Sequence, residues 1–337
     1  MSSLSNHPFP KILGYWHRNL SGMSYTPLFL LVKAVEILAF RNGQGHAGAG
    51  RKMEHYARYR GTNDVPEKPT ISVVVPAYVK NKNDISNIQR LSEQLLAQTY
   101  QANVIVVDDN SPMDFQLAGN IKIIRLSKNH GPAKARNIGI KRALSSGTEV
   151  ILLTDIDCVP SLNWIEQMVQ GFQRDRECHI LSGKTYSWDK TWLGTYHDIN
   201  GTLNGRRFKD SDQLLYGPTC NLALTRRVAE EITFDTEFPY AAGEDIEFCF
   251  RALAKGFNIK HCQDAIMFHD FGYHRYGLIS NLIKFIFMFK KYTKGERILL
   301  QKIPEYYSYL DATIEIGDKG TSNKKPSSVY YYSDAHK

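Results

Sequence analysis

The chain has 337 residues, of which 42% are hydrophobic, so it can bury a sizeable core as one large domain with extensions or as two small domains. Lys and Arg number 42 against 34 Asp and Glu, and the net charge of +8 suits an anionic partner such as a nucleotide, although it also fits a solvated surface without one. The five scattered cysteines contain no C-x-x-C pair, so neither a disulfide framework nor a structural zinc site is indicated, and a reducing cytoplasm is expected.

Residues 1–69 precede the main pattern of the chain and are interpreted as an N-terminal extension. The polar start lacks a charged region leading into an apolar core, so no cleavable signal peptide is expected. The longest apolar run, residues 25–40, is interrupted by Lys33 and Glu36 and falls short of the roughly 18 uncharged residues of a membrane span. We therefore expect no transmembrane helix.

From residue 70, short β-branched runs alternate with longer helical stretches, which is the pattern of an α/β sheet with helices on its faces. Pro76 is expected to stop the first strand, and Asp84 is expected to cap the first helix. The pattern predicts this first strand within the segment 70–78, further strands at 103–109, 121–126 and 149–157, and helices at 84–99 and 131–147.

Two acidic pairs, Asp108/Asp109 and Asp155/Asp157, fall just past the carboxyl ends of predicted strands, where open α/β sheets bind ligands. The D-x-D triplet of the second pair can hold a divalent cation, although a solvated turn that caps a helix would also explain it. Sugar-nucleotide transferases and D-x-D phosphohydrolases both carry such a triplet. A phosphohydrolase normally carries it on the first strand of its domain, whereas three strands come first here, so the phosphohydrolase is the alternative.

Residues 129–139, NHGPAKARNIG, lie between the two acidic pairs and place Lys134 and Arg136 in the first turns of a helix. These charges and the amide end of the helix would bind a diphosphate between the sheet edge and a metal. Without the acidic motifs, the same residues would indicate an exposed basic helix face.

Residues 241–257 predict a helix that begins after Gly243, with Glu244 and Asp245 in its first turn. Acids in this position stabilise any helix through its dipole, but the flexible preceding segment EFPYAAG would leave them facing an opening. Downstream, His269 ends a predicted strand, where it is either a metal ligand or a packed imidazole.

Taken in order, VVVPAY, VVDDNS, NHGPAKARNIG, LLTDID, GPTCNLALTRR and GEDIEFCFRALAKG resemble the motifs of family 2 glycosyltransferases, over about residues 70–275. The resemblance implies a GT-A fold, which is a Rossmann-like mixed β-sheet flanked by helices, here with N- and C-terminal extensions. It also implies a nucleoside pocket with Arg136 close to the base or the phosphates. The expected nucleotide-sugar-binding residues are Pro76, Ala77, Tyr78, Asp108, Asp109, Lys134, Arg136, Asp155 and Glu244.

The same resemblance implies metal ligands and a catalytic base. Asp155 and Asp157 match the D-x-D that holds Mn²⁺ or Mg²⁺ on the donor diphosphate, with Asp157 as the direct ligand, and His269 matches a third metal ligand. Asp245 matches the general base, with Glu244 as the competing candidate. An inverting transfer needs only one in-line displacement and no protein nucleophile.

The donor and acceptor are expected from the resemblance in general terms. UDP is the family's commonest donor nucleotide, and the acceptor would be a sugar, a lipid-linked molecule, a peptide or a small molecule, for which the aromatic and basic segment 186–216 is suited. The family's polymer synthases carry Q-x-x-R-W and transmembrane helices, and neither occurs here, so we expect transfer of one or a few sugars. A degenerate domain that only binds is the non-catalytic alternative, and no recognised motif supports a nucleic-acid partner.

The segment 276–337 is predicted to contain an amphipathic helix at 276–294, followed by a polar tail. The Ile and Phe face of this helix, with Lys284, Lys290 and Lys291, would contact anionic lipid, whereas a helix packed on the catalytic domain is the alternative. The expected location is cytoplasmic, with peripheral contact at the inner face of the membrane.

Overall fold

The computed structural model describes residues 61–316, apart from residues 118, 120 and 190. Most of the expected N-terminal extension and the polar tail therefore lie outside the described residues. In the part that is described, no helix combines the length and the apolar character that crossing a bilayer requires.

A mixed eight-stranded sheet forms the centre of the fold, in the order β3-β2-β1-β4-β9-β6-β10-β5. β1 pairs in parallel with β2 and β4, whereas β9 runs antiparallel between β4 and β6. The expected Rossmann-like mixed sheet is thus confirmed. Its strands are β1 (Ile71–Ala77), β2 (Asn103–Asp108), β3 (Lys122–Arg125), β4 (Val150–Leu153), β5 (Cys158–Pro160), β6 (Ile180–Ser187), β9 (Leu222–Thr225) and β10 (Ile259–His269).

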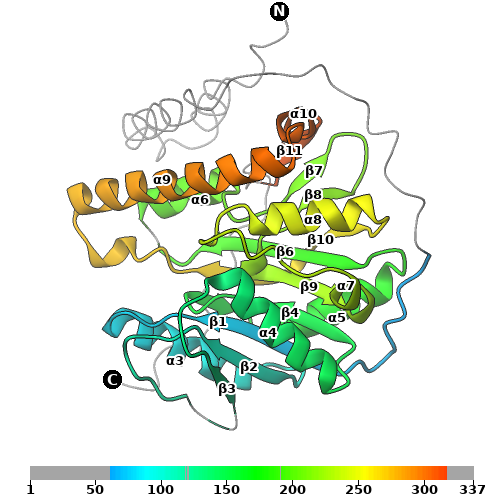
Figure 1. The fold of residues 1–337 in the computed structure, drawn as a ribbon, viewed down its shortest axis with the longest axis horizontal. Coiled ribbons are helices and arrows are strands. Elements are labelled where there is room, and N and C mark those ends of the chain that lie inside the picture. Colours follow the sequence, from blue (N-terminus) through cyan, green and yellow to red (C-terminus); the bar gives the residue numbers. More distant parts are fainter. Residues whose placement is uncertain (1–60, 118, 120, 190, 317–337) are drawn as a thin grey trace, which may run out of the picture.

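Helices cover both faces of this sheet (Figure 1). β1 shows the division, because Val74 packs toward the α4 side while Val73 and Val75 pack toward the α3 side, as the two-residue period of a strand requires. Gly139 lets α4 lie directly on β1, since a Cβ there would be 2.3 Å from Cγ1 of Val74. One face carries α3 (Lys82–Leu96) and α5 (Trp164–Arg174), and the other carries α4 (Pro132–Ser145), α7 (Arg226–Glu231) and α8 (Glu244–Ala254).

The remaining elements extend the α8 side of the molecule. A small sheet in the order β11-β7-β8 lies there, and α9 crosses the top of the view in Figure 1. Leu299, Ile303 and Tyr306 join the buried cluster that contains the inner face of α8, so the C-terminal segment packs on the sheet domain. These elements are α6 (Trp192–Asn200), β7 (Arg206–Phe208), β8 (Leu214–Tyr216), η2 (Thr219–Asn221), η3 (Tyr273–Arg275), α9 (Leu278–Lys302), α10 (Tyr306–Asp311) and β11 (Thr313–Glu315).

Two local expectations were wrong. β1 continues through Pro76 to Ala77, because its parallel pairing with β2 extends to Ala77, although its pairing with β4 ends at Val74. The cap of α3 is Asn81, whose side chain accepts the N–H groups of Asn83 and Asp84, while the Asp84 carboxylate accepts the N–H of Lys80. The helix predicted at 276–294 is longer and runs to Lys302.

Candidate active site

The acidic motifs converge at the carboxyl edge of the central strands. The D-x-D segment follows β4, whose neighbour β1 runs parallel and ends at the same edge. β5 starts directly after the triplet and pairs antiparallel with the end of β10, with Cys158 opposite His269. This pairing places the end of β10, which is far from the D-x-D triplet in the sequence, next to that triplet in the structure.

Asp157 and His269 form the candidate metal site. Nε2 of His269 lies 3.3 Å from Oδ1 of Asp157, and the two side chains are 16% and 35% exposed. The Asp270 N–H donates to the Asp157 carbonyl over 2.7 Å, which fixes the loop. Nδ1 of His269 is buried and has no hydrogen-bond partner among the described residues.

The donor set fits Mn²⁺ or Mg²⁺. Ligand atoms of Asp157, Cys158 and His269 lie within 4.8 Å of one another. Burial and the neighbouring Cys220 raise the pKa of the Cys158 thiol, so it stays protonated, and oxygen and imidazole nitrogen remain as donors. Burial raises the pKa of Asp157, and the negative charge of Asp155 raises it further, while His269 lowers it. A cation bound here would therefore offset the repulsion between the two carboxylates.

Arg136 connects the metal side of the site to the start of α8. Its guanidinium is completely buried and donates to Oδ1 of Asp155 over 2.7 Å and to Oε1 of Glu244 over 2.8 Å. Burial disfavours its charge, but the two carboxylates outweigh this and raise its pKa. Arg136 was expected close to the base or the phosphates. Because both of its terminal nitrogens are taken by carboxylates of this chain, it is better described as a clamp.

Asp245 lies beside this clamp and differs from its neighbour. Glu244 is buried against Arg136, whereas Asp245 is partly exposed. Burial, and next the charge of Glu244, raise the pKa of Asp245 to about 7. The dipole at the start of α8 favours the ionised carboxylate, but desolvation and the like charge of Glu244 have the larger effect. Gly243, with φ of 92°, provides the left-handed turn that starts α8 at this point.

The expected nucleoside-pocket residues divide into exposed and buried groups. Tyr78 is 38% exposed and Lys134 is exposed, so both can contact a ligand. Asp108 is buried and pairs with Arg125 at 2.9 Å. Asp109 is buried and accepts the backbone N–H groups of His130 and Gly131, at 2.8 and 2.7 Å, just before α4. Pro76 is half-buried and Ala77 is buried at the end of β1.

Tyr292 was missed by the sequence reasoning. Burial raises the pKa of its phenol, and the next contribution comes from Asp245, with Asp157 adding to it, so α9 brings this side chain close to both halves of the site. No local motif marks Tyr292, because it lies on a helix beyond the acidic segments. In the expected acceptor segment, Tyr196 and His197 are buried among Phe271, Tyr273 and Phe285, so these two rings support the fold.

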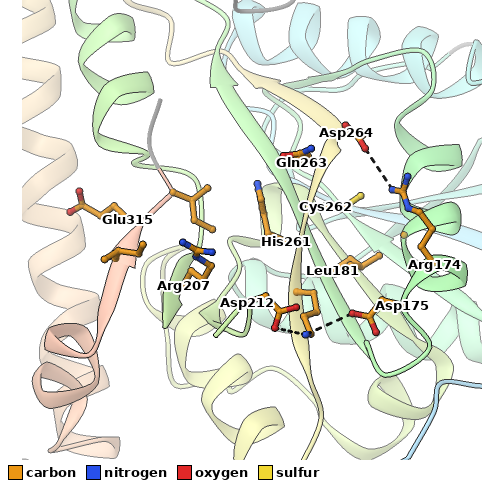
Figure 2. Close-up of a pocket in the computed structure, with 14 residues that line it drawn as sticks. Arg174, Asp175, Leu181, Arg207, Asp212, His261, Cys262, Gln263, Asp264 and Glu315 are labelled. Atoms are coloured by element: carbon orange, nitrogen blue, oxygen red, sulfur yellow. Dashed lines mark ion pairs between the residues drawn. The ribbon is translucent and has the colours of Figure 1, made fainter. Parts of the chain in front are cut away.

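An open hollow of about 660 Å³ lies elsewhere, between the first half of β10, the end of α5 and β11 (Figure 2). Its charged side chains form two groups of ion pairs. Lys260 pairs with Asp212 and Asp175, and Arg174 pairs with Asp264. None of the expected nucleotide-sugar-binding, metal-binding or catalytic residues lines it, although Arg207 and Asp212 belong to the expected acceptor segment 186–216. The hollow is therefore separate from the acidic site.

Residues 72–233 match the model of glycosyl transferase family 2. The human polypeptide N-acetylgalactosaminyltransferase 13 is 27% identical over 221 residues, which are 55% of this chain and 38% of that protein. A pre-mycofactocin glycosyltransferase of Mycobacterium tuberculosis is 24% identical over 61% of this chain and 43% of the length of that protein. The dTDP-rhamnosyl transferase RfbF of Shigella flexneri is 27% identical over 56% of this chain and 66% of its own. This chain thus spans less than two thirds of these relatives.

The similar solved structures have lower sequence identity to this chain than these relatives do. TarS residues 1–349 of S. aureus with UDP has a TM-score of 0.47 at 19% identity, over 71% of this chain and 72% of that chain. GalNAc-T7 with UDP, GalNAc and Mn²⁺ has a TM-score of 0.49 at 17% identity, over 61% of this chain and 44% of that chain.

Proposed function

Residues 72–233 belong to glycosyl transferase family 2, and from this premise we propose that the protein transfers a sugar from a nucleotide-diphosphate sugar to a hydroxyl acceptor. The observation that supports this most is that Asp157 lies 3.3 Å from His269, while Arg136 links the neighbouring Asp155 to Glu244, the residue before Asp245. We propose a UDP-sugar as donor, because UDP is the commonest donor nucleotide among the family 2 enzymes that the motifs resemble.

Asp157 and His269 would hold Mn²⁺ or Mg²⁺, with Asp155 alongside. When bound, the cation supplies positive charge to the diphosphate that leaves. Asp155 is kept in place by Arg136, since a 2.7 Å charged hydrogen bond restricts its rotamer. Tyr78 and Lys134 are exposed for contact with the nucleotide.

Asp245 is the proposed general base of an inverting transfer. The acceptor oxygen bonds to the anomeric carbon, the bond from that carbon to the diphosphate oxygen breaks, and the acceptor proton moves to the Asp245 carboxylate. A pKa of about 7 suits this role, because the group is ionised for much of the time and is still basic enough to take the proton. Glu244 is occupied by Arg136, which leaves Asp245 as the candidate.

The phosphohydrolase alternative has less support. Its nucleophile would be the first Asp of the triplet, and Asp155 is held by the buried guanidinium of Arg136. An Arg-paired carboxylate is a weak nucleophile, because the ion pair stabilises its negative charge.

The experiment is a panel of nucleotide-sugars scored for release of the nucleoside diphosphate, with Mn²⁺ and with chelator. We expect one donor, a UDP-sugar, to be turned over only with the metal. Release of inorganic phosphate from phosphomonoesters would favour the phosphohydrolase. Binding of the donor without turnover, in the presence of an acceptor panel, would indicate a degenerate module.

A further inference from the structure

The first half of α9 presents an apolar face to solvent. Ile279 is 74% exposed and Phe287 is 63% exposed, while Ile283 and Ile286 are 49% and 37% exposed. At 100° per residue these four side chains fall within an arc of roughly 100°, so they form one stripe along the helix. We call these four residues the outer stripe. Exposed contiguous apolar surface of this kind marks an interaction site.

The opposite face of α9 fixes the orientation of the helix. Asn281 is buried, and its amide donates to the carbonyls of Tyr273 and Tyr276 at 2.8 and 3.0 Å. Phe285 is 1% exposed and packs edge-on against Tyr196. The polar Asn281 therefore points inward while the outer stripe points outward. A helix on a protein surface in water normally has its polar side chains outward and its apolar side chains inward, so this arrangement is reversed. The contacts of Asn281 and Phe285 hold the helix in this orientation, so the exposure of the stripe does not result from a loosely packed helix.

Basic residues follow the outer stripe along the helix. Lys290 and Lys294 lie on the same helical arc as the stripe, and Lys291 lies next to them. Residues 278–295 contain no acidic residue. The Lys290 ammonium lies 5.4 Å from the Phe287 ring, and that of Lys294 lies 5.9 Å from the Tyr240 ring, which is itself exposed. Lys284 does not belong to this group, since its ammonium donates to the Phe271 carbonyl over 2.6 Å. The expectation that Lys284 meets headgroups is therefore wrong.

We propose that the outer stripe and these three lysines bind the surface of an anionic lipid bilayer. The stripe would enter the interface, and the lysines would meet the headgroups, as in helices that lie on a membrane. Charge complementarity favours lipid over a second copy of this chain, because pairing two such faces would bring lysines together without acids to balance them. The same helix packs against the segment just before Asp245, since a Cβ at Gly295 would lie 2.0 Å from the carbonyl oxygen of Ala242, so binding holds the candidate site next to the bilayer.

The test is co-sedimentation of the full chain with vesicles of phosphatidylcholine alone or with roughly one third phosphatidylserine. No sugar donor is present, so the result is independent of the proposed transfer. We expect binding to the anionic vesicles at low salt and release at high salt. The double variant Ile279→Ser, Phe287→Ser should bind at least about tenfold more weakly, because two large apolar groups no longer enter the interface.

The matched control is Ile123→Ser, which makes the same kind of change at an exposed position of the edge strand β3 and should bind like the wild type. Both altered positions of the double variant are exposed, so its thermal unfolding should stay close to that of the wild type. Absence of binding to anionic vesicles, or equal binding by the double variant, would overturn the proposal. A dimer in analytical ultracentrifugation that dissociates in the double variant, without vesicle binding, would assign the face to a second copy.

Discussion

Arg136 and Asp155 form a 2.7 Å ion pair in which the guanidinium is completely buried and the carboxylate is 25% exposed. The other arm of the same guanidinium holds Glu244, the first residue of α8 and the neighbour of Asp245. One side chain of α4 thus sets the position of the D-x-D segment relative to the proposed base.

Replacing Arg136 with Met should destabilise the protein by about 3–5 kcal/mol, because it leaves two carboxylates without their buried partner. The measurement is urea denaturation at neutral pH. Arg142→Met on the exposed face of α4 is the control and should change stability by less than about 0.5 kcal/mol. Adding Glu244→Gln to Arg136→Met should recover part of the loss, and simple additivity of the two changes would contradict the clamp.

Replacing Asp157 with Ala should weaken Mn²⁺-dependent UDP binding by more than the roughly 10–100-fold that loss of an outer-shell partner costs. The reason is that the candidate site has few protein ligands, so the loss of one has a large effect. Titration calorimetry with UDP and Mn²⁺ would measure the affinity. Asp264→Ala, which changes an exposed acid of β10 outside the site, should bind normally. Unchanged metal-dependent affinity in the Asp157 variant would remove the assignment. His269→Ala should weaken metal binding less, and an effect on stability alone would make His269 a packed imidazole.

Replacing Asp245 with Asn keeps the shape of the side chain and removes the proton acceptor. Turnover should fall by roughly 10²–10⁴-fold while donor affinity stays near normal. Steady-state kinetics and the anomeric configuration of the product, read by NMR, test this. Near-normal turnover or a product that retains the donor's configuration would rule out Asp245 as the base of an inverting reaction.

The pH profile should report the same group. Since the pKa of Asp245 is raised to about 7, the base becomes protonated as the pH falls below this value, and kcat/KM should drop about tenfold per pH unit. Above it the profile should be flat, because Asp245 is then ionised. Burial, and next the charge of Glu244, raise the pKa of this carboxyl group, while the N–H of Ile246 and the guanidinium of Arg136 lower it. The residual activity of Asp245→Asn should lack the acidic limb, and an identical limb in that variant would assign the titration to another group.

The sequence by itself was sufficient for the alternation of strands and helices and for the start of α8 after Gly243. It also placed the acidic pairs at strand ends. These features depend on local hydrophobic period and on turn residues, which can be recognised within a short window. The capping of α3 by Asn81 was missed because two neighbouring polar residues could each have made the cap.

The tertiary structure decided which charges face one another. Lys134 and Arg136 look alike in the sequence as basic residues of one helix, yet one is exposed and the other lies buried between Asp155 and Glu244. The raised pKa of Asp245 and the proximity of Tyr292 also depend on α8 and α9 packing over the sheet edge. Burial and the distance between charges determine these properties, and both arise from contacts between segments far apart in the chain, so no local pattern contains them.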